Sequence, residues 1–203
     1  MANICTDQET LYADIDFCQG KKSLPGIRSY VYGASKRDIV TWPKIDRSTK
    51  ETLDTINVYE GDFVMAADKK WHKIALVPNE GQLQIESQGT FGSKTFKVTA
   101  TMNMPGTEEE VSGYIAEANN DEMVYLVPQR NGKFRVVGSE AFSSELSLAQ
   151  DTGKAATDSN MTTVTAEATD EYPAPFYVGK IETEAGDINA ADGTVAEPDE
   201  EGG

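Results

Sequence analysis

Few residues of this chain have the types and spacing that catalysis requires. Asp170 and Glu171 are adjacent carboxylates, and glycosidases use paired carboxylates, but 34 acidic residues in 203 make such pairs expected by chance. His72 is the only histidine, and the sequence around it supplies no recognisable partner for acid–base chemistry. We therefore expect no catalytic site at either position.

The motifs that hold phosphates or metal ions are also missing from the sequence. Gly89–Lys94 reads Gly-Thr-Phe-Gly-Ser-Lys, which ends like a phosphate-binding loop but lacks its spacing. There is no HxxxH, CxxC or Asp-rich calcium loop. Whether Cys5 and Cys18 pair is left open by the sequence. The expectation is a protein that is not an enzyme and has no cofactor and no metal site.

Four segments that alternate apolar and polar residues occupy the middle of the chain. Lys94–Met104 alternates without interruption, and Gln82–Gln88, Ala141–Ala149 and Met161–Thr169 have the same period. Period-2 alternation is typical of strands that are buried on one side. The other side of all four segments is rich in Gln, Ser, Thr and Glu. We expect a sheet that packs on a core through one face and meets water through the other.

One amphipathic helix is predicted over Glu108–Ala118. Thr107 and Glu110 have the spacing of a capping box, in which each side chain bonds the backbone amide near the other. The apolar side chains recur at i, i+3, i+4 and i+7, which gives a narrow stripe for docking on a sheet: Val111, Tyr114, Ile115 and Ala118.

A hairpin is predicted after this helix, with Met123–Val127 and Phe134–Val137 as its arms. Asn131–Gly132 favours a type I′ turn between them. Pro128 indicates that the first arm lies at a sheet edge or carries a bulge. Together these elements predict a mainly β (α+β) fold, an antiparallel β-sandwich or barrel with one flanking α-helix.

The charge of the chain is strongly acidic, with a formal net charge of −16. Such a charge argues against a nucleic-acid-binding groove and against an anionic membrane surface. No apolar run approaches the roughly 20 residues of a membrane span. The segment Glu182–Gly203 holds eight acidic residues, no Lys or Arg and no aromatic residue. This composition predicts a β domain over residues 1–181 and a disordered acidic tail over residues 182–203.

The order of elements from Gly89 to Ile181 resembles that of the tail tube proteins (major tail proteins) of tailed bacteriophages, in a siphovirus-like form. The order is a long strand, a capped helix, a hairpin, and two strands separated by a loop. The amino-acid sequence is most similar to that family in two segments. One is MVYLVPQRNGKFRVVGSE, which begins at Met123, and the other is Asp151–Phe176, where a Thr-rich strand precedes Tyr-Pro-Ala-Pro. The resemblance covers roughly half of the chain; the first ninety residues match less clearly, and the acidic tail lies outside it.

This resemblance implies a structural virion protein that forms stacked hexameric rings around a continuous inner β-barrel. DNA would pass through the lumen without specific binding. The partners would be further copies of the chain and other tail proteins, with no membrane, in a virion tail assembled in the bacterial cytoplasm. Lys97 departs from a purely acidic lumen. The polar strand faces supply the residues expected to face the lumen: Gln84, Glu86, Thr99, Thr101, Ser143, Glu145, Ser147, Thr163, Thr165 and Glu167.

Two other classes of function compete with this one. The chain could be a different virion structural protein, such as a capsid decoration protein or a tail terminator. It could also be a β-sandwich module that binds glycans, which needs aromatic rings exposed on one sheet face. The aromatic residues available for such a platform are Trp42, Trp71 and Tyr172.

Overall fold

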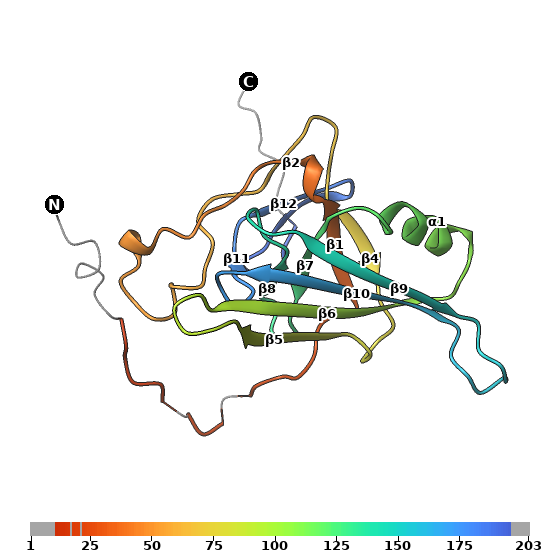
Figure 1. Cartoon of the computed structure of the whole chain (residues 1–203), viewed down its shortest axis with the longest axis horizontal. Helices are drawn as coiled ribbons and strands as arrows, with labels where there is room; N and C mark the ends of the chain where they lie inside the picture. Colours follow the sequence, from red (N-terminus) through yellow and green to blue (C-terminus); the bar gives the residue numbers. More distant parts are fainter. Residues whose placement is uncertain (1–10, 17, 21, 196–203) are drawn as a thin grey trace.

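The fold is an antiparallel β-sandwich with one flanking α-helix, which confirms the predicted fold class. The computed structural model describes residues 11–16, 18–20 and 22–195, so that Cys5 lies outside the described residues. Two sheets pack face to face (Figure 1), with strand orders β11-β8-β7-β1-β4 and β5-β6-β10-β9. The five-stranded sheet consists of β1 (Tyr30–Ser35), β4 (His72–Ala75), β7 (Met123–Pro128), β8 (Phe134–Val137) and β11 (Phe176–Tyr177).

The four-stranded sheet contains the four segments with period-2 alternation. It consists of β5 (Gln82–Gln88), β6 (Thr95–Pro105), β9 (Ser144–Asp151) and β10 (Met161–Asp170). Strand β9 begins three residues later than predicted. Ala141 and Phe142 belong to a turn instead, in which the Phe142 amide donates a 3.1 Å hydrogen bond to Ser139 Oγ. The remaining short elements are β2 (Ile39–Thr41), β3 (Val64–Met65), β12 (Lys180–Thr183), β13 (Gly186–Asn189) and the 3-10 turns η2 (Lys36–Asp38) and η3 (Arg47–Thr49).

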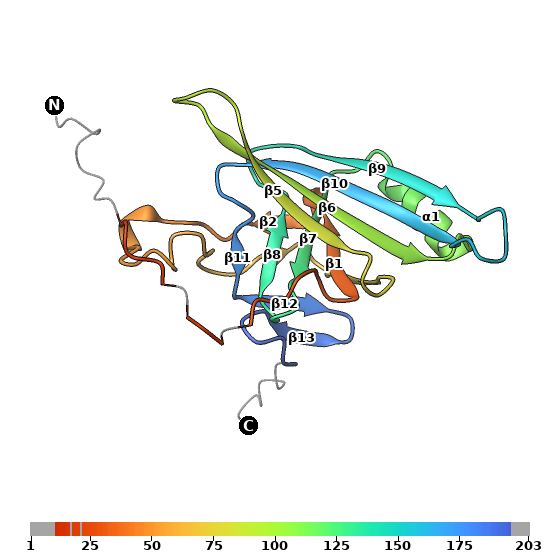
Figure 2. The same ribbon diagram turned by 90° about the horizontal axis from the view of Figure 1, so that it is seen from below.

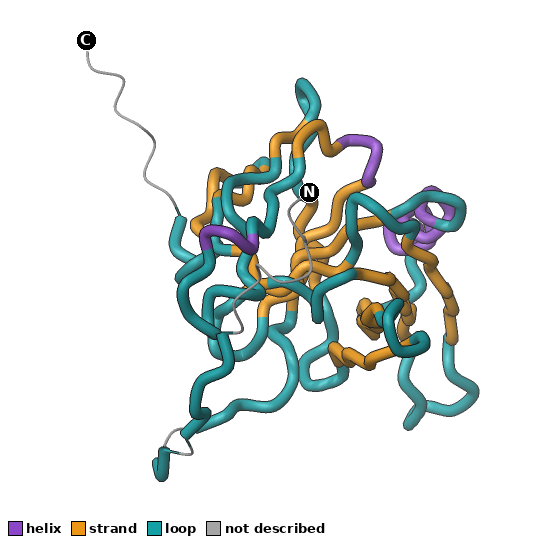
Figure 3. Tube along the Cα trace, turned by 60° about the vertical axis from the view of Figure 1, so that its left-hand side comes forward, coloured by secondary structure: helices purple, strands orange, loops and turns teal. Residues whose placement is uncertain are grey.

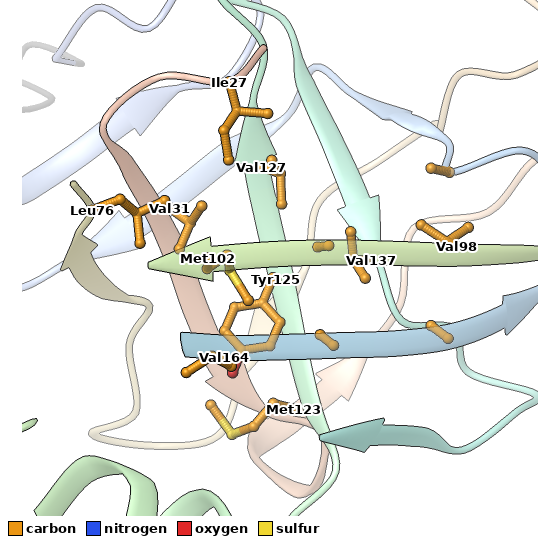
Figure 4. Close-up of a cluster of buried hydrophobic side chains, with 14 of the residues drawn as sticks. Ile27, Val31, Leu76, Val98, Met102, Met123, Tyr125, Val127, Val137 and Val164 are labelled. Atoms are coloured by element: carbon orange, nitrogen blue, oxygen red, sulfur yellow. The ribbon is translucent and has the colours of Figure 1, made fainter. Parts of the chain in front are cut away.

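The main core lies between the two sheets (Figure 4). The inward residues of β6 and β10 include Ala100 and Ala166, which are fully buried. Opposite them the five-stranded sheet contributes larger side chains, among them the buried ring of Tyr125. The Tyr125 ring lies beside Met102 and Val164 of the four-stranded sheet, so that side chains of both sheets fill the space between them.

A second apolar cluster covers the outer face of the five-stranded sheet. All six residues of β7 are buried because this strand has packed side chains on both faces. The outer cluster is rich in aromatic rings, and Phe63 packs edge-on against Trp42 and Trp71 at centroid distances of 5.2 and 5.3 Å. Irregular segments between β2 and β4 and the C-terminal strands supply most of this cover.

Helix α1 (Glu109–Ala118) docks beside the strands as predicted (Figure 3). Its apolar stripe packs on the core between the sheets, and the Tyr114 and Tyr125 hydroxyls are 2.8 Å apart. The predicted capping box is wrong. Glu108 is the N-cap residue and makes no side-chain cap. Thr107 instead offers its backbone carbonyl, which accepts a hydrogen bond from Ser112 Oγ.

The predicted hairpin of β7 and β8 forms, but its turn differs from type I′. Asn131 does not have a positive φ, whereas Gly132 has a φ of 93°. The Gly132 amide donates to the Gln129 carbonyl, and the Gln129 amide donates to the Lys133 carbonyl. This is the three-residue loop with a glycine at the left-handed position. Pro128 was expected at a sheet edge or at a bulge, but it ends a strand inside its sheet, between β8 and β1, and pairs with Phe134 in continuous register.

The predicted disorder of residues 182–203 is wrong for the part that the structure describes. Strands β12 and β13 form a hairpin (Figure 2), and Ile181 and Ala190 are fully buried in the outer cluster. The acidic residues of this hairpin face water, where Lys180 lies 3.2 Å from Glu182 and 2.7 Å from Asp187. The acidic composition predicted disorder, but the few apolar residues of this segment are placed so that Ile181 and Ala190 can be buried. Residues 196–203 lie outside the described part.

Helix docking can be tested with Tyr114→Ala. We expect this change to lower the free energy of unfolding by about 3 kcal/mol, because a large ring leaves the core and the Tyr125 hydroxyl loses its partner. Tyr114→Phe, which removes only the hydroxyl, should cost about 1 kcal/mol. Glu109→Ala, on the exposed face, is the control. Equal urea midpoints for Tyr114→Ala and Glu109→Ala would contradict the observed orientation of α1.

The role of the C-terminal hairpin can be tested by truncation. Removing residues 182–203 takes away β13 and the carbonyl of Glu182, to which the Trp71 amide donates a 2.9 Å hydrogen bond. We expect the melting temperature to fall by about 5 °C or more, since part of the outer cluster becomes exposed. Removing only residues 196–203 is the matched control. An unchanged melting temperature for both truncations would show that the hairpin contributes no stability.

Candidate functional site

The predicted polar residues lie together on one face of the four-stranded sheet. Strand register places Gln84, Thr99, Glu167 and Glu145 in one row across all four strands. The next row contains Gln82, Thr101, Thr165 and Ser147. Glu86 pairs with Lys97, and Thr163 pairs with Asn103. Of the ten predicted residues only Ser143 lies outside the strands, in the exposed position before β9.

The opposite face of the same strands holds this surface in place. The residues between the polar ones point into the core, and Val98, Ala100, Val164 and Ala166 are all buried. On β6 and β10 the buried residues on either side of each polar side chain therefore fix its direction. We call this surface the polar face, defined by the nine predicted residues in the strands together with Gln82, Lys97 and Asn103.

The electrostatics of the polar face centre on Lys97. Its ammonium group lies 2.9 Å from Glu167 Oε1, and this contact raises the pKa of Lys97, with smaller contributions from Glu86 and Glu145. Gln84 Nε2 donates a 2.7 Å hydrogen bond to Glu86 Oε1. From the sequence, Lys97 was only a departure from a purely acidic surface. In the structure, three carboxylates lie near enough to act on its charge. The polar face keeps a negative net charge.

Both edges of the four-stranded sheet are open. Among the described residues, no strand pairs with the outer side of β5 or with the outer side of β9. An open edge presents unpaired backbone amides and carbonyls that can accept another strand. The two edges flank the polar face, so that pairing at both edges would extend that face into neighbouring molecules.

A second feature is a hollow of about 270 Å³ beside the end of β10. Its walls include Trp42, Tyr59, Phe142 and Tyr172, and Asp170 also lines it. Asp170 is only 6% exposed, and its Oδ2 accepts no hydrogen bond from the described residues. Burial raises the pKa of Asp170 to about 6. The other oxygen, Oδ1, accepts a 3.0 Å hydrogen bond from the Tyr172 amide.

The remaining residues with possible chemistry are scattered. His72 is exposed on β4, and Gly89–Lys94 joins β5 to β6 at a hairpin tip. No group of three His, Cys, Asp or Glu residues that could hold a metal ion occurs among the described residues. The predicted aromatic platform does not form, since Trp71 is 1% exposed and Trp42 is also buried. Sequence reasoning missed the hollow because its walls come from segments that are far apart in the chain.

The environment of Asp170 generates a pH-dependent prediction. Its pKa of about 6 in the folded protein exceeds the roughly 3.9 of an unfolded chain, so the folded state binds the proton more tightly. Asp170 therefore contributes a loss of stability as the pH rises from about 4 through 6. The stability of Asp170→Asn relative to the unmodified protein should rise by about 1–3 kcal/mol between pH 4 and pH 7.

Chemical denaturation at several pH values measures this effect. Glu171→Gln, at the exposed neighbouring position, is the control and should show no such rise. A constant difference between Asp170→Asn and the unmodified protein across this range would contradict the buried position of the carboxyl group.

Comparison of the chain with protein-family models, with curated proteins and with solved structures finds no match. In the part of the chain that the structure describes, none of the helices has the length and apolar character needed to cross a membrane.

Proposed function

We propose that this protein is a structural subunit of a phage tail tube, without enzymatic activity, which assembles into hexameric rings that stack around a DNA channel. The single observation that supports this proposal most is the polar face. Four strands in unbroken register present Gln, Ser, Thr and Glu side chains to water, and both edges of that sheet are open. Such a sheet can serve as one segment of a larger barrel.

Ring closure follows from pairing the outer side of β5 in one copy with the outer side of β9 in the next. Each contact joins two different edges, which is the heterologous arrangement that generates rings when the rotation closes. Four strands from each of six subunits would give a barrel of 24 strands. Barrels of 16–18 strands already leave an aqueous channel, so this one would be wide. Closure would also remove the open edges.

The charge of the polar face suits a channel through which DNA must slide. Glu86, Glu145 and Glu167 repel phosphate, and the contact with Glu167 limits the attraction that Lys97 could exert. The neighbouring hydroxyl and amide groups are small and uncharged. In this proposal DNA meets no run of basic side chains to which its backbone could adhere.

The alternatives differ in what they require of the molecule. A tail terminator would form one ring without stacking, and a capsid decoration protein would bind a shell rather than close a barrel. A glycan-binding module of the predicted kind would need Trp42 and Trp71 at the surface, but both are buried. We propose the tail tube because it uses the polar face and both open edges together, and because the order of elements from Gly89 to Ile181 resembles that of tail tube proteins.

The lumen assignment is tested by replacing Glu86, Glu145 and Glu167 with Lys. All three side chains reach water in the single chain, so that the variant should fold. In a hexamer the change reverses three charges per subunit that line the channel. We expect tubes that bind DNA in a strongly salt-dependent manner and virions whose DNA delivery is slowed.

The matched control reverses three exposed acidic residues on α1, namely Glu109, Glu110 and Glu117. This control changes the net charge equally but lies away from the proposed channel. Unchanged DNA delivery in the first variant would count against the lumen assignment, as would equal DNA binding by tubes of both variants.

A further inference from the structure

The hairpin that joins β5 and β6 presents an aromatic ring to water. Phe91 is 99% exposed, and the hairpin extends beyond the rest of the sheet (Figure 2). The turn is well defined, because the Ser93 amide donates a 3.0 Å hydrogen bond to the Thr90 carbonyl and Gly92 has a φ of 92°. At Gly89, with a φ of 89°, an added Cβ would lie 2.8 Å from the Ser93 carbonyl oxygen. The backbone thus holds Phe91 at the corner of a tight turn.

The hollow beside β10 is complementary to this hairpin tip in its aromatic and acidic lining. Its volume of about 270 Å³ is below the roughly 300–1,000 Å³ of pockets for drug-sized ligands, and four of its twelve lining residues are aromatic. Three carboxylates line it (Glu140, Asp170 and Glu171) against the single ammonium group of Lys44. By contrast, the hairpin tip Gly89–Lys94 has one basic residue, Lys94, and no acidic one.

We propose that the hollow receives the hairpin tip of a second copy of this chain, with Phe91 between the aromatic walls and Lys94 facing the carboxylates. Burial of the Phe91 ring would remove the most exposed large apolar side chain of the described residues from water. The Lys94 ammonium would give the buried Asp170 Oδ2 a hydrogen-bond donor, which it lacks within the chain.

The hairpin tip does not fill the hollow of its own chain, since Phe91 is 99% exposed, although the two lie at the same end of the sheet. Gln88 pairs with Thr95, and Asp170 pairs with Phe96, so that the tip and the hollow lie at the same end of the four-stranded sheet. The tip nevertheless leaves Phe91 free of contacts with its own chain. The proposed Phe91 contact rests on the proposed function in one respect, namely that copies of this chain associate. It does not require that they form a tube or that DNA passes through it.

Disulfide trapping tests the contact. In a background of Cys5→Ser and Cys18→Ser, protein with Thr90→Cys is mixed with protein with Ala141→Cys. The first change keeps Phe91 at the tip, and the second places a thiol at an exposed position that lines the hollow. We expect disulfide-linked heterodimers to form at least about tenfold faster than with Glu117→Cys on α1, because only the first pair is brought together by the contact. Adding Phe91→Ala to the Thr90→Cys protein should remove this difference.

Sedimentation of the cysteine-free protein gives the second readout. Phe91→Ala should weaken self-association about tenfold or more, as for a central aromatic anchor, while its melting temperature stays unchanged because Phe91 touches nothing in the single chain. Equal crosslinking of the hollow and of α1, or unchanged self-association of Phe91→Ala, would overturn the proposal. If Phe91→Ala forms tubes as well as the unmodified protein does, the proposed Phe91 contact is wrong, but the proposed tail tube is not contradicted. Trapped oligomers without a channel would support the contact and contradict the tube.

Discussion

The pairing of β6 with β10 is the constraint on which the rest of the structure depends. Ten consecutive residue pairs run from Met161 opposite Pro105 to Asp170 opposite Phe96. A slip of one residue would turn every side chain of a strand to the other face. Val98 and Val164 would then meet water, and the polar face would enter the core. One register therefore sets both the packing between the sheets and the surface that faces outward.

The core beneath this pair of strands also holds the helix. The Tyr125 ring lies beside Met102 and Val164 (Figure 4), and its hydroxyl is 2.8 Å from that of Tyr114 on α1. The helix is thereby tied to the same core as the polar face. The five-stranded sheet is buried on its other side by the aromatic cluster around Phe63, which leaves the four-stranded sheet as the one with an open polar face. The five-stranded sheet is thus covered on both faces, whereas the four-stranded sheet has one polar face open to water.

The sequence predicts the half of the fold in which periodicity is strong. Alternation located β5, β6 and β10 within one residue at each end, and the apolar stripe located α1. Alternation also predicted that ten polar residues share one face, and nine of them lie on the strands that form it, Ser143 being the exception. The outer cluster could not be predicted in this way, because Trp42, Phe63 and Trp71 lie on irregular segments without a period. The C-terminal hairpin was missed since its acidic composition outweighed the pattern around Ile181. The hollow is assembled from distant segments, and no local signal points to it.

In the proposed assembly of six subunits, the polar face lines a channel. Cryo-electron microscopy of the purified protein at high concentration would show where this face lies. We expect rings or tubes in which β5 of each subunit adjoins β9 of the next, with Glu86, Glu145 and Glu167 lining the central hole. A protein that stays monomeric at every concentration, or an assembly whose polar face lies away from the central hole, would contradict it.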